Sequence, residues 1–208
     1  MSIECKGISK SFKHKTLFQD FSATFSQGVC HCIVGENGVG KTTLLKIMSG
    51  LIKPDSGWVK TSGICTYSGS NPYMLRGTVM ENIAYPLALK RQLGRRSQEA
   101  VYDMLRQLGL EALKDQEAKT LSAGEKQKVA LGRALVWDPE ILLLDEPTAN
   151  IDSSMIEMIE GYLQGYLKNK NRTLVVVSHD HDQVKRLSDV LWEIKDKSGE
   201  MTIAKRGE

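Results

Sequence analysis

The sequence predicts an α/β fold with a parallel, doubly wound core sheet, an N-terminal antiparallel β subdomain and an inserted helical subdomain. Three observations predict it. An apolar stretch at 32–34 runs into a glycine-rich loop, and a helical pattern follows that loop. Residues 78–137 carry apolar side chains mainly at helical spacing. Apolar runs at 141–144 and 173–177, separated by another helical pattern, are typical of strands buried on both faces of a parallel sheet.

The N-terminal part of the chain is expected to be β structure. Residues 2–34 have the pattern of strands, and apolar and polar side chains alternate over 21–25. The helix after the glycine-rich loop is expected over 41–49, where most side chains are apolar. Gly50 is placed to end that helix, because glycine is the common residue just past a helix C-terminus.

The later elements follow from the same periodicities. In the helical region, one helix has apolar residues at helical spacing over 101–108 and stops at Gly109, and a second helix is expected over 123–136. A third helical pattern, over 155–166, separates the two apolar strands. The last stretch, 189–205, is expected to add short antiparallel strands.

Composition excludes several classes of protein. Hydrophobic residues make up 41% of the 208 residues and charged residues 25%, so the chain can bury a core and is not intrinsically disordered. Its net charge of +3 is too small for a broad nucleic-acid or anionic-membrane surface, so we expect no nucleic-acid partner. No apolar run approaches the roughly 18 to 20 residues that span a bilayer, and the N-terminus lacks the apolar core of a secretory signal. We therefore expect a cytoplasmic protein.

The four cysteines are expected to be thiols, because disulfides are rare in the reducing cytosol. Cys30, His31 and Cys32 also admit a metal-binding interpretation. However, residues two apart in a strand point to the same face, so two small buried side chains explain the pattern.

A phosphate-binding motif occupies residues 35–42, with the sequence GENGVGKT. Glycines at its two ends allow backbone N–H groups to surround an anion, and the following helix adds its positive N-terminal end. Lys41 would reach the β- and γ-phosphates of a nucleotide, and Thr42 would bind Mg²⁺. The alternative, a turn that merely joins a strand to a helix, requires neither of these two side chains. The motif predicts a P-loop NTPase.

Two carboxylates, Asp145 and Glu146, directly follow the apolar run at 141–144. In open α/β sheets, ligands bind at the carboxyl ends of the strands. Asp145 can then hold Mg²⁺, and Glu146 can orient or deprotonate an attacking water. Two solvated acids at a strand end remain the alternative.

With these two sites, the sequence resembles the ATP-binding cassette (ABC) ATPases over residues 2–198. Residues 121–125 (LSAGE) resemble the family signature, residues 149–152 (ANID) its D-loop, and residues 177–180 (VSHD) its switch-histidine segment. The resemblance implies that two cassettes enclose two ATP molecules head to tail, so that one chain supplies half of each site. It also assigns functional residues. The implied catalytic residues are Glu146 and His179; nucleotide is bound by Phe12, Gly35, Asn37, Gly38, Gly40, Lys41, Thr42, Thr43, Ser122 and Gly124; and Mg²⁺ is held by Thr42, Asp145 and Ser70.

Several of these residues also have a purely structural explanation. By the resemblance Phe12 stacks on adenine, but it could instead pack within the N-terminal sheet. Ser122 and Glu125 form the pattern of a capping box, which starts a helix without any ligand. His179 could be a hydrogen-bonded histidine at a strand end. Asp152 could cap the helix beginning near Ser153 as well as communicate across the dimer.

The sequence departs from the family pattern at one functional position. Ser70 stands where the family has a glutamine that reaches Mg²⁺ and relays the nucleotide state to the helical subdomain. A serine is shorter and could reach the metal only through a water. Ala123 and Glu125 also replace the commoner glycine and glutamine of the signature. These changes bear on coupling more than on nucleotide binding.

The resemblance implies a single ABC ATPase domain over 1–208, with a nucleotide-binding core at about 1–69 and 128–208 and a helical subdomain at about 70–127. Its implied function is to power solute import as a peripheral subunit at the inner face of the cell membrane. The implied partners are a second ATPase subunit, expected as a homodimer, integral membrane permease subunits and a solute-binding protein. The sequence around residues 73–87, followed by residues 147–150 (PTAN), is similar to that of tungstate or molybdate importers. The apolar residues within 73–87 either receive the permease or pack internally.

Two other functions are considered. A soluble cassette ATPase for cluster assembly, DNA repair or translation is the first, but the chain has neither the long coiled coil nor the second cassette of some such proteins. A small-molecule kinase or GTPase is the second. It is disfavoured because the stretch at 169–172 lacks the Asp of a guanine-binding motif and because a kinase has no use for the signature.

Overall fold

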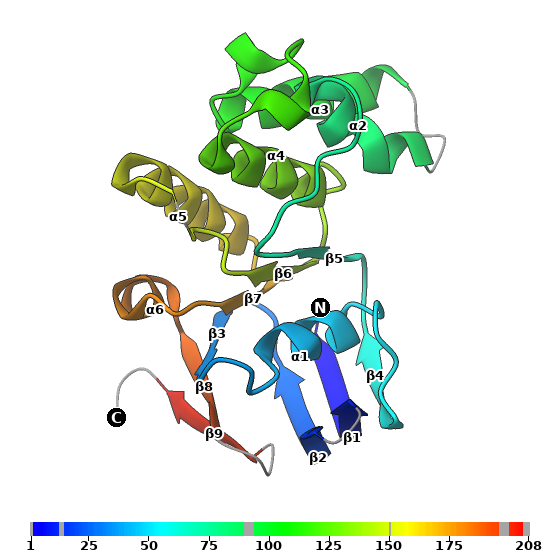
Figure 1. Cartoon of the computed structure of the whole chain (residues 1–208), viewed down its shortest axis with the longest axis vertical. Helices are drawn as coiled ribbons and strands as arrows, with labels where there is room; N and C mark the ends of the chain where they lie inside the picture. The colour runs from blue at the N-terminus through cyan, green and yellow to red at the C-terminus, as the bar shows by residue number, and fades with distance from the viewer. Residues whose placement is uncertain (1, 13–14, 90–93, 150, 196–199, 206–208) are drawn as a thin grey trace. The chain divides into compact units, whose positions relative to one another are not determined.

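The computed structural model describes residues 2–12, 15–89, 94–149, 151–195 and 200–205, with side chains described up to residue 194. Contacts within the chain divide it into two compact units (Figure 1). One unit comprises residues 1–67, 140–146 and 166–208, and the other comprises 68–139 and 147–165. The boundaries expected for the helical subdomain, about 70–127, stay a prediction.

The first unit begins with the N-terminal antiparallel sheet that the sequence predicts. Its strands β1 (Ile3–Phe12), β2 (Lys15–Phe25) and β4 (Ser56–Thr61) are arranged in the order β2-β1-β4. Both neighbours of β1 are antiparallel to it. Gly57 allows the close approach of β4 to β1, because a Cβ at this position would lie 2.3 Å from the carbonyl oxygen of Gly7.

The core sheet has six strands in the order β5-β6-β7-β3-β8-β9. Strand β3 lies between β7 and β8 and is parallel to both, and β6 is parallel to β7. The carboxyl ends of β3, β6 and β7 therefore meet at one edge of the sheet, where α/β proteins bind ligands. The strands are β3 (Cys30–Gly35), β5 (Cys65–Ser68), β6 (Ile141–Asp145), β7 (Thr173–Val177), β8 (Val190–Lys195) and β9 (Glu200–Lys205).

The C-terminal strands confirm one expectation and add a parallel pairing to it. Strands β8 and β9 are antiparallel to each other, as the sequence predicts for 189–205, but β8 also extends the core sheet in parallel with β3. The reason is the helix α6 (His181–Leu187), which lies between β7 and β8 in the chain and returns it to the edge where the parallel strands begin.

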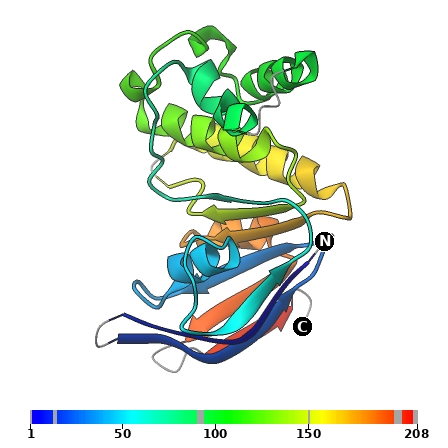
Figure 2. The same cartoon turned by 90° about the vertical axis from the view of Figure 1, so that its right-hand side faces the viewer.

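One hydrophobic core joins the two sheets of the first unit. Helix α1 (Lys41–Met48), whose backbone is drawn in Figure 2, buries four apolar side chains in it, together with large residues of the N-terminal sheet such as Phe18 and Phe25. One face of the core sheet contributes alternate residues, for example Leu143 from β6. Helix α1 ends at the predicted place, and Gly50 just beyond it has a positive φ of 78°.

The two cysteines of β3 are buried core residues, and no group of three or more possible metal ligands is found among the described residues. Cys30 and Cys32 are both fully buried, and their sulfur atoms lie 4.0 Å apart on the same face of the strand. His31 points to the other face, where its Nε2 lies 3.0 Å from the carbonyl oxygen of Ser26 and its Nδ1 lies 3.0 Å from Nε1 of Trp192.

The second unit is mainly helical. Helix α2 contacts α3 and α4, and α3 also contacts α4. The predicted helix at 123–136 is observed as α4, and that at 155–166 lies within α5, which buries Ile159, Leu163 and Tyr166. Among the described residues, no helix is long and apolar enough to cross a bilayer. The helices are α2 (Val79–Leu89), α3 (Arg95–Gln107), η1 (Glu111–Leu113), η2 (Ala118–Thr120), α4 (Ala123–Leu135) and α5 (Ser153–Leu167).

Candidate functional site

The glycine-rich loop joins β3 to α1 through a backbone that only glycine adopts readily. Gly35, Gly38 and Gly40 have φ values of 149°, 76° and 115°. At Gly40 a side chain is also excluded by packing, because a Cβ there would lie 2.8 Å from the ring of Phe18 in β2. Helix α1 begins at the next residue, so its free backbone N–H groups open onto the loop. Asn37 is exposed in this loop, and Thr43 follows in the first turn of the helix.

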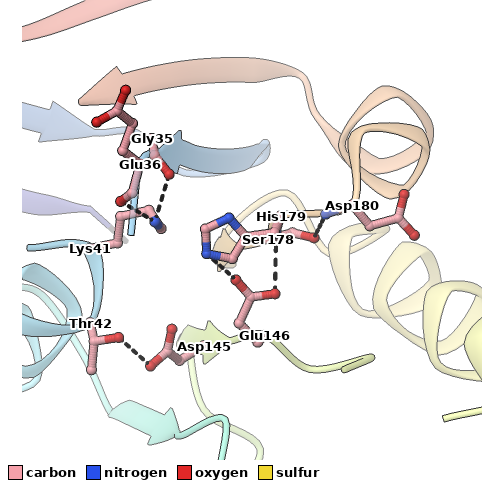
Figure 3. Close-up of polar contacts among 9 residues, drawn as sticks. All are labelled: Gly35, Glu36, Lys41, Thr42, Asp145, Glu146, Ser178, His179 and Asp180. Carbon is pink, nitrogen blue, oxygen red and sulfur yellow. Dashed lines mark hydrogen bonds and ion pairs between the residues drawn. The ribbon is translucent and has the colours of Figure 1, made fainter. Parts of the chain in front are cut away.

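Lys41 holds its ammonium group inside the loop (Figure 3). The side chain is only 6% exposed, and Nζ donates hydrogen bonds of 2.7 Å to the carbonyl of Gly35 and 2.9 Å to that of Glu36. Burial lowers the pKa of Lys41, and the carboxylates of Glu146 and Asp145 act in the opposite direction. The ammonium is therefore held inside the loop by two backbone carbonyls, and its contact with phosphate stays a prediction.

Thr42 and Asp145 bring two oxygen ligands together. The hydroxyl of Thr42 donates a 2.8 Å hydrogen bond to Oδ2 of Asp145, which is buried at the end of β6 (Figure 3). The same Oδ2 accepts a longer bond of 3.4 Å from the phenol of Tyr67 in β5. Hydroxyl and carboxylate oxygens are the donors that Mg²⁺ prefers, so these residues fit a magnesium ion. The role of Tyr67 was missed in the sequence, because no local pattern pairs it with Asp145.

Glu146 is directed toward His179 by an unusual backbone conformation. Its φ is 51°, a value uncommon for a residue other than glycine, and its N–H still donates to the carbonyl of Val177 at 2.9 Å. Oε1 lies 3.2 Å from Nε2 of His179, and Oε2 accepts a 3.3 Å hydrogen bond from the backbone N–H of His179 (Figure 3). The two side chains, from the ends of β6 and β7, thus form one acid–histidine pair.

The environment of this pair suits proton transfer. Desolvation raises the pKa of Glu146, whereas the N–H and the imidazole of His179 act to lower it. The carboxylate is 20% exposed and the histidine 49% exposed, so both can be reached from solvent. In the residue before His179, the hydroxyl of Ser178 accepts a 3.0 Å hydrogen bond from the N–H of Asp180, whose side chain caps α6.

Phe12 does not pack inside the N-terminal sheet. Its side chain is 45% exposed at the end of β1, where the ammonium of Lys10 lies 5.2 Å from the ring centroid. Lys10 is itself held by a 2.6 Å ion pair with Asp55. The exposed ring is therefore available to a flat ligand, and its assignment to adenine stays a prediction.

The second unit carries the remaining predicted site residues. Ser122 and Glu125 form the predicted capping box at the start of α4: the backbone N–H and hydroxyl of Ser122 donate to Oε2 of Glu125 at 2.8 and 2.7 Å. A Cβ on Gly124 would lie 2.8 Å from the sulfur of Met155. Ser70 is exposed in the segment after β5. Their predicted roles toward nucleotide and metal stay predictions.

Asp152 acts as the cap that the sequence allows. Its Oδ1 accepts hydrogen bonds of 3.0 Å from the N–H of Met155 and 2.5 Å from the hydroxyl of Ser154, at the start of α5. A role across a dimer remains compatible with this structural one.

The family model for ABC transporters matches residues 18–149, more than half of the chain. The chain belongs to the ABC transporter ATPase family. It is 40% identical over 197 residues to the tungstate uptake system ATP-binding protein of Peptoclostridium acidaminophilum, covering 91% of this chain and 92% of that protein. It is 31% identical to a spermidine/putrescine import ATP-binding protein of Legionella pneumophila (strain Paris), covering 90% of this chain and 55% of that protein.

Solved structures agree with this membership. An ABC cassette in a dimeric post-hydrolysis state bound to ADP and Pi has a TM-score of 0.89 and 25% identity, covering 99% of this chain and 100% of that one. A second dimeric structure of the same cassette, which is that of a bacterial ABC transporter, has a TM-score of 0.88 and 26% identity, with the same coverage. This ABC ATPase therefore has the P-loop NTPase fold, binds ATP and hydrolyses it, as the sequence predicts.

Proposed function

We propose that this ABC ATPase powers import through a separate membrane permease, and that it does so with the residues grouped at the carboxyl edge of the core sheet. The observation that carries the proposal is the convergence of Lys41, Asp145 and the Glu146–His179 pair from three different strand ends. Each of these groups suits one requirement of phosphoryl transfer from ATP to water: phosphate binding, metal binding and proton transfer.

Binding of the triphosphate is assigned to the loop. Its backbone N–H groups and the ammonium of Lys41 would stabilise the negative charge of the β- and γ-phosphates. Asn37, Gly38 and Thr43 would contribute to the same phosphate-binding loop. Phe12 would stack on adenine. Thr42 and Asp145 would hold Mg²⁺, with Ser70 acting through a water; the metal would neutralise charge on the phosphates.

Proton transfer is assigned to Glu146. Its carboxylate would accept a proton as the oxygen of water bonds to the γ-phosphorus and the bond to the β-phosphate oxygen breaks, giving ADP and phosphate. His179, already 3.2 Å from that carboxylate, would donate a hydrogen bond at the γ-phosphate and hold the Glu146 side chain. The raised pKa of Glu146 makes it a better base than an ordinary surface carboxylate.

A second copy of the chain would complete each site. In this arrangement Ser122 and Gly124 of one copy donate hydrogen bonds to the γ-phosphate held by the loop of the other, and the positive end of α4 adds to them. A homodimer is supported by one ABC cassette among the structural neighbours, which is dimeric in two solved structures. Ser122 would then exchange its bond with Glu125 for a bond with phosphate.

Import is supported by the relatives, whose names are those of tungstate uptake, spermidine/putrescine import and phosphate import proteins. We propose an oxyanion of the tungstate type as cargo, and permease and solute-binding subunits as partners. The chain would then lie on the cytoplasmic face of the membrane. No specific observation favours the soluble alternative, an ABC ATPase that is not tied to transport.

Replacing Glu146 with Gln tests the assignment. We expect ATP binding to persist and hydrolysis to slow by about 10²- to 10⁴-fold, because the general base is lost. The rate of phosphate release is measured for the wild type and for the variant, and the ratio of the two rates gives the loss of hydrolysis. The variant Glu157→Gln, at an exposed position on α5, serves as the control. Hydrolysis at the normal rate would refute the role of Glu146.

In cells, the same variant should also reduce tungstate accumulation; unchanged accumulation would exclude tungstate as the cargo.

A further inference from the structure

Strand β2 contacts the phosphate loop at two places. The ring of Phe18 lies directly under Gly40, where it leaves no room for a side chain. Three residues earlier, at the start of β2, Nζ of Lys15 donates a 2.7 Å hydrogen bond to the carbonyl of Gly38. Charged donors make the shorter and stronger hydrogen bonds, and 2.7 Å lies at the short end of their range. The loop is thus attached to β2 by one apolar and one charged contact.

Lys15 is also tied to Phe12. The two residues are directly opposite each other in the antiparallel pair β1–β2. Side chains of directly opposed residues lie on the same side of a sheet and close together. Since the ammonium of Lys15 reaches the loop, Phe12 is on the side of the sheet that faces the loop. Among the ion pairs of the described residues, Lys15 has no carboxylate partner, so its charge is directed to the loop.

We propose that Lys15 is a positioning residue for the nucleotide: its bond to Gly38 fixes the exposed ring of Phe12 at the distance from the phosphate loop that a nucleoside polyphosphate requires. This inference rests on the proposed binding of adenine by Phe12. A nucleotide that contacts both the ring and the loop loses less freedom when the two are already held at the correct separation. A bare polyphosphate contacts the loop alone and gains nothing from Lys15 in this way.

The test compares ADP with inorganic pyrophosphate, because neither is hydrolysed and they differ in the adenosine. Binding of each with Mg²⁺ is measured by calorimetry for the wild type, Lys15→Met, Lys15→Arg and Phe12→Ala. We expect Lys15→Met to weaken ADP binding by about three- to ten-fold, as for one charged hydrogen bond at a partly exposed site, with pyrophosphate binding unchanged. Lys15→Arg keeps the charge and the donors, so it should restore ADP binding. Lys60→Met, on the exposed face of β4, is the control for removing one positive charge.

A double-mutant cycle asks whether Lys15 acts through Phe12. If it does, Lys15→Met should add little to the loss caused by Phe12→Ala, because the two changes remove the same advantage. Equal weakening of ADP and pyrophosphate by Lys15→Met would mean that Lys15 binds phosphate directly, and it would overturn the proposal. So would additive effects in the cycle, or ADP binding that does not depend on Lys15.

The same data separate this proposal from the proposed function. If Phe12→Ala weakens ADP binding while Lys15→Met does not, the adenine site stands and the positioning role fails. If Phe12→Ala has no effect on ADP binding, the assignment of adenine to Phe12 fails, and the role of Lys15 fails with it. Pyrophosphate binding that persists in every variant shows that the loop itself remains folded.

Discussion

Among single residues, Lys41 carries the sharpest expectation for nucleotide binding. Its ammonium is held by two carbonyls of the loop and is almost completely buried, so its removal leaves the cradle without its central charge. Lys41→Ala should weaken ATP binding by roughly 2 to 5 kcal/mol, the cost of losing one partner of a buried charge pair. Equilibrium titration measures this, with Lys46→Ala on the same helix as the control. Unchanged ATP affinity would contradict the cradle.

His31 predicts a pH dependence of stability. Burial lowers its pKa below the ordinary value of about 6.5, while the Ser26 carbonyl and Asp189 oppose the shift. Below that ordinary pKa the unfolded chain takes up a proton that the folded chain resists, because the ring is buried and its Nδ1 already accepts the Trp192 N–H. The free energy of unfolding contributed by His31 is therefore fully present above about pH 6.5 and declines as the pH falls toward the folded-state pKa.

Denaturant unfolding at pH 7.5 and 5.5 checks this expectation, with His31→Gln as the matched variant because its amide does not titrate. The wild type should lose more stability than His31→Gln between the two pH values. Equal losses would mean that His31 takes up its proton as readily in the folded as in the unfolded chain.

At the scale of elements, both the backbone conformation and the packing of the glycine-rich loop require a glycine at position 40. Gly40 has a positive φ, and a Cβ would meet the ring of Phe18. Gly40→Ala should therefore distort the loop, lower the stability and abolish ATP binding. Gly161 lies in α5 with open space around it, so Gly161→Ala should stabilise the protein by up to about 1 kcal/mol through helix propensity. Thermal unfolding and ATP titration of both variants would show this contrast; equal behaviour would contradict it.

The elements that the sequence predicted well are those with strong local patterns. The buried strands β6 and β7 and the helices α1 and α4 begin and end within a residue or so of the predicted positions, because their periodicity, glycines and caps are local signals. The parallel pairing of β8 with β3 was not predicted, since it joins segments far apart in the chain. Two site contacts were missed for the same reason: those of Tyr67 with Asp145 and of Lys15 with Gly38.

For the Glu146–His179 pair, the sequence predicted the two residues but not the geometry that brings them together. The motifs suggested both residues, but not that a left-handed backbone at Glu146 would direct its carboxylate to the imidazole and backbone N–H of His179. Such a conformation is rare for a residue other than glycine and costs about 1 to 3 kcal/mol. The hydrogen bonds of Glu146 to Val177 and His179 offset part of that cost.

For the whole molecule, we propose that one chain holds only half of a hydrolytic site. The loop residues, Asp145, Glu146 and His179 lie in one compact unit, whereas Ser122 and Gly124 belong to the other. ATP would bind between the loop of one copy and the signature of a second. Its binding energy would then favour the paired state of the chain over the unpaired one, and hydrolysis would release it.

Sedimentation of Glu146→Gln with ATP or with ADP tests this claim most directly. With ATP and Mg²⁺ the variant should sediment as a dimer, because the triphosphate is held but not cleaved; with ADP, which has no γ-phosphate for Ser122, it should remain a monomer. Adding Ser122→Arg to the same variant should prevent the dimer while leaving ATP bound. A variant that stays monomeric with saturating ATP, or that dimerises equally with ADP, would contradict the shared site.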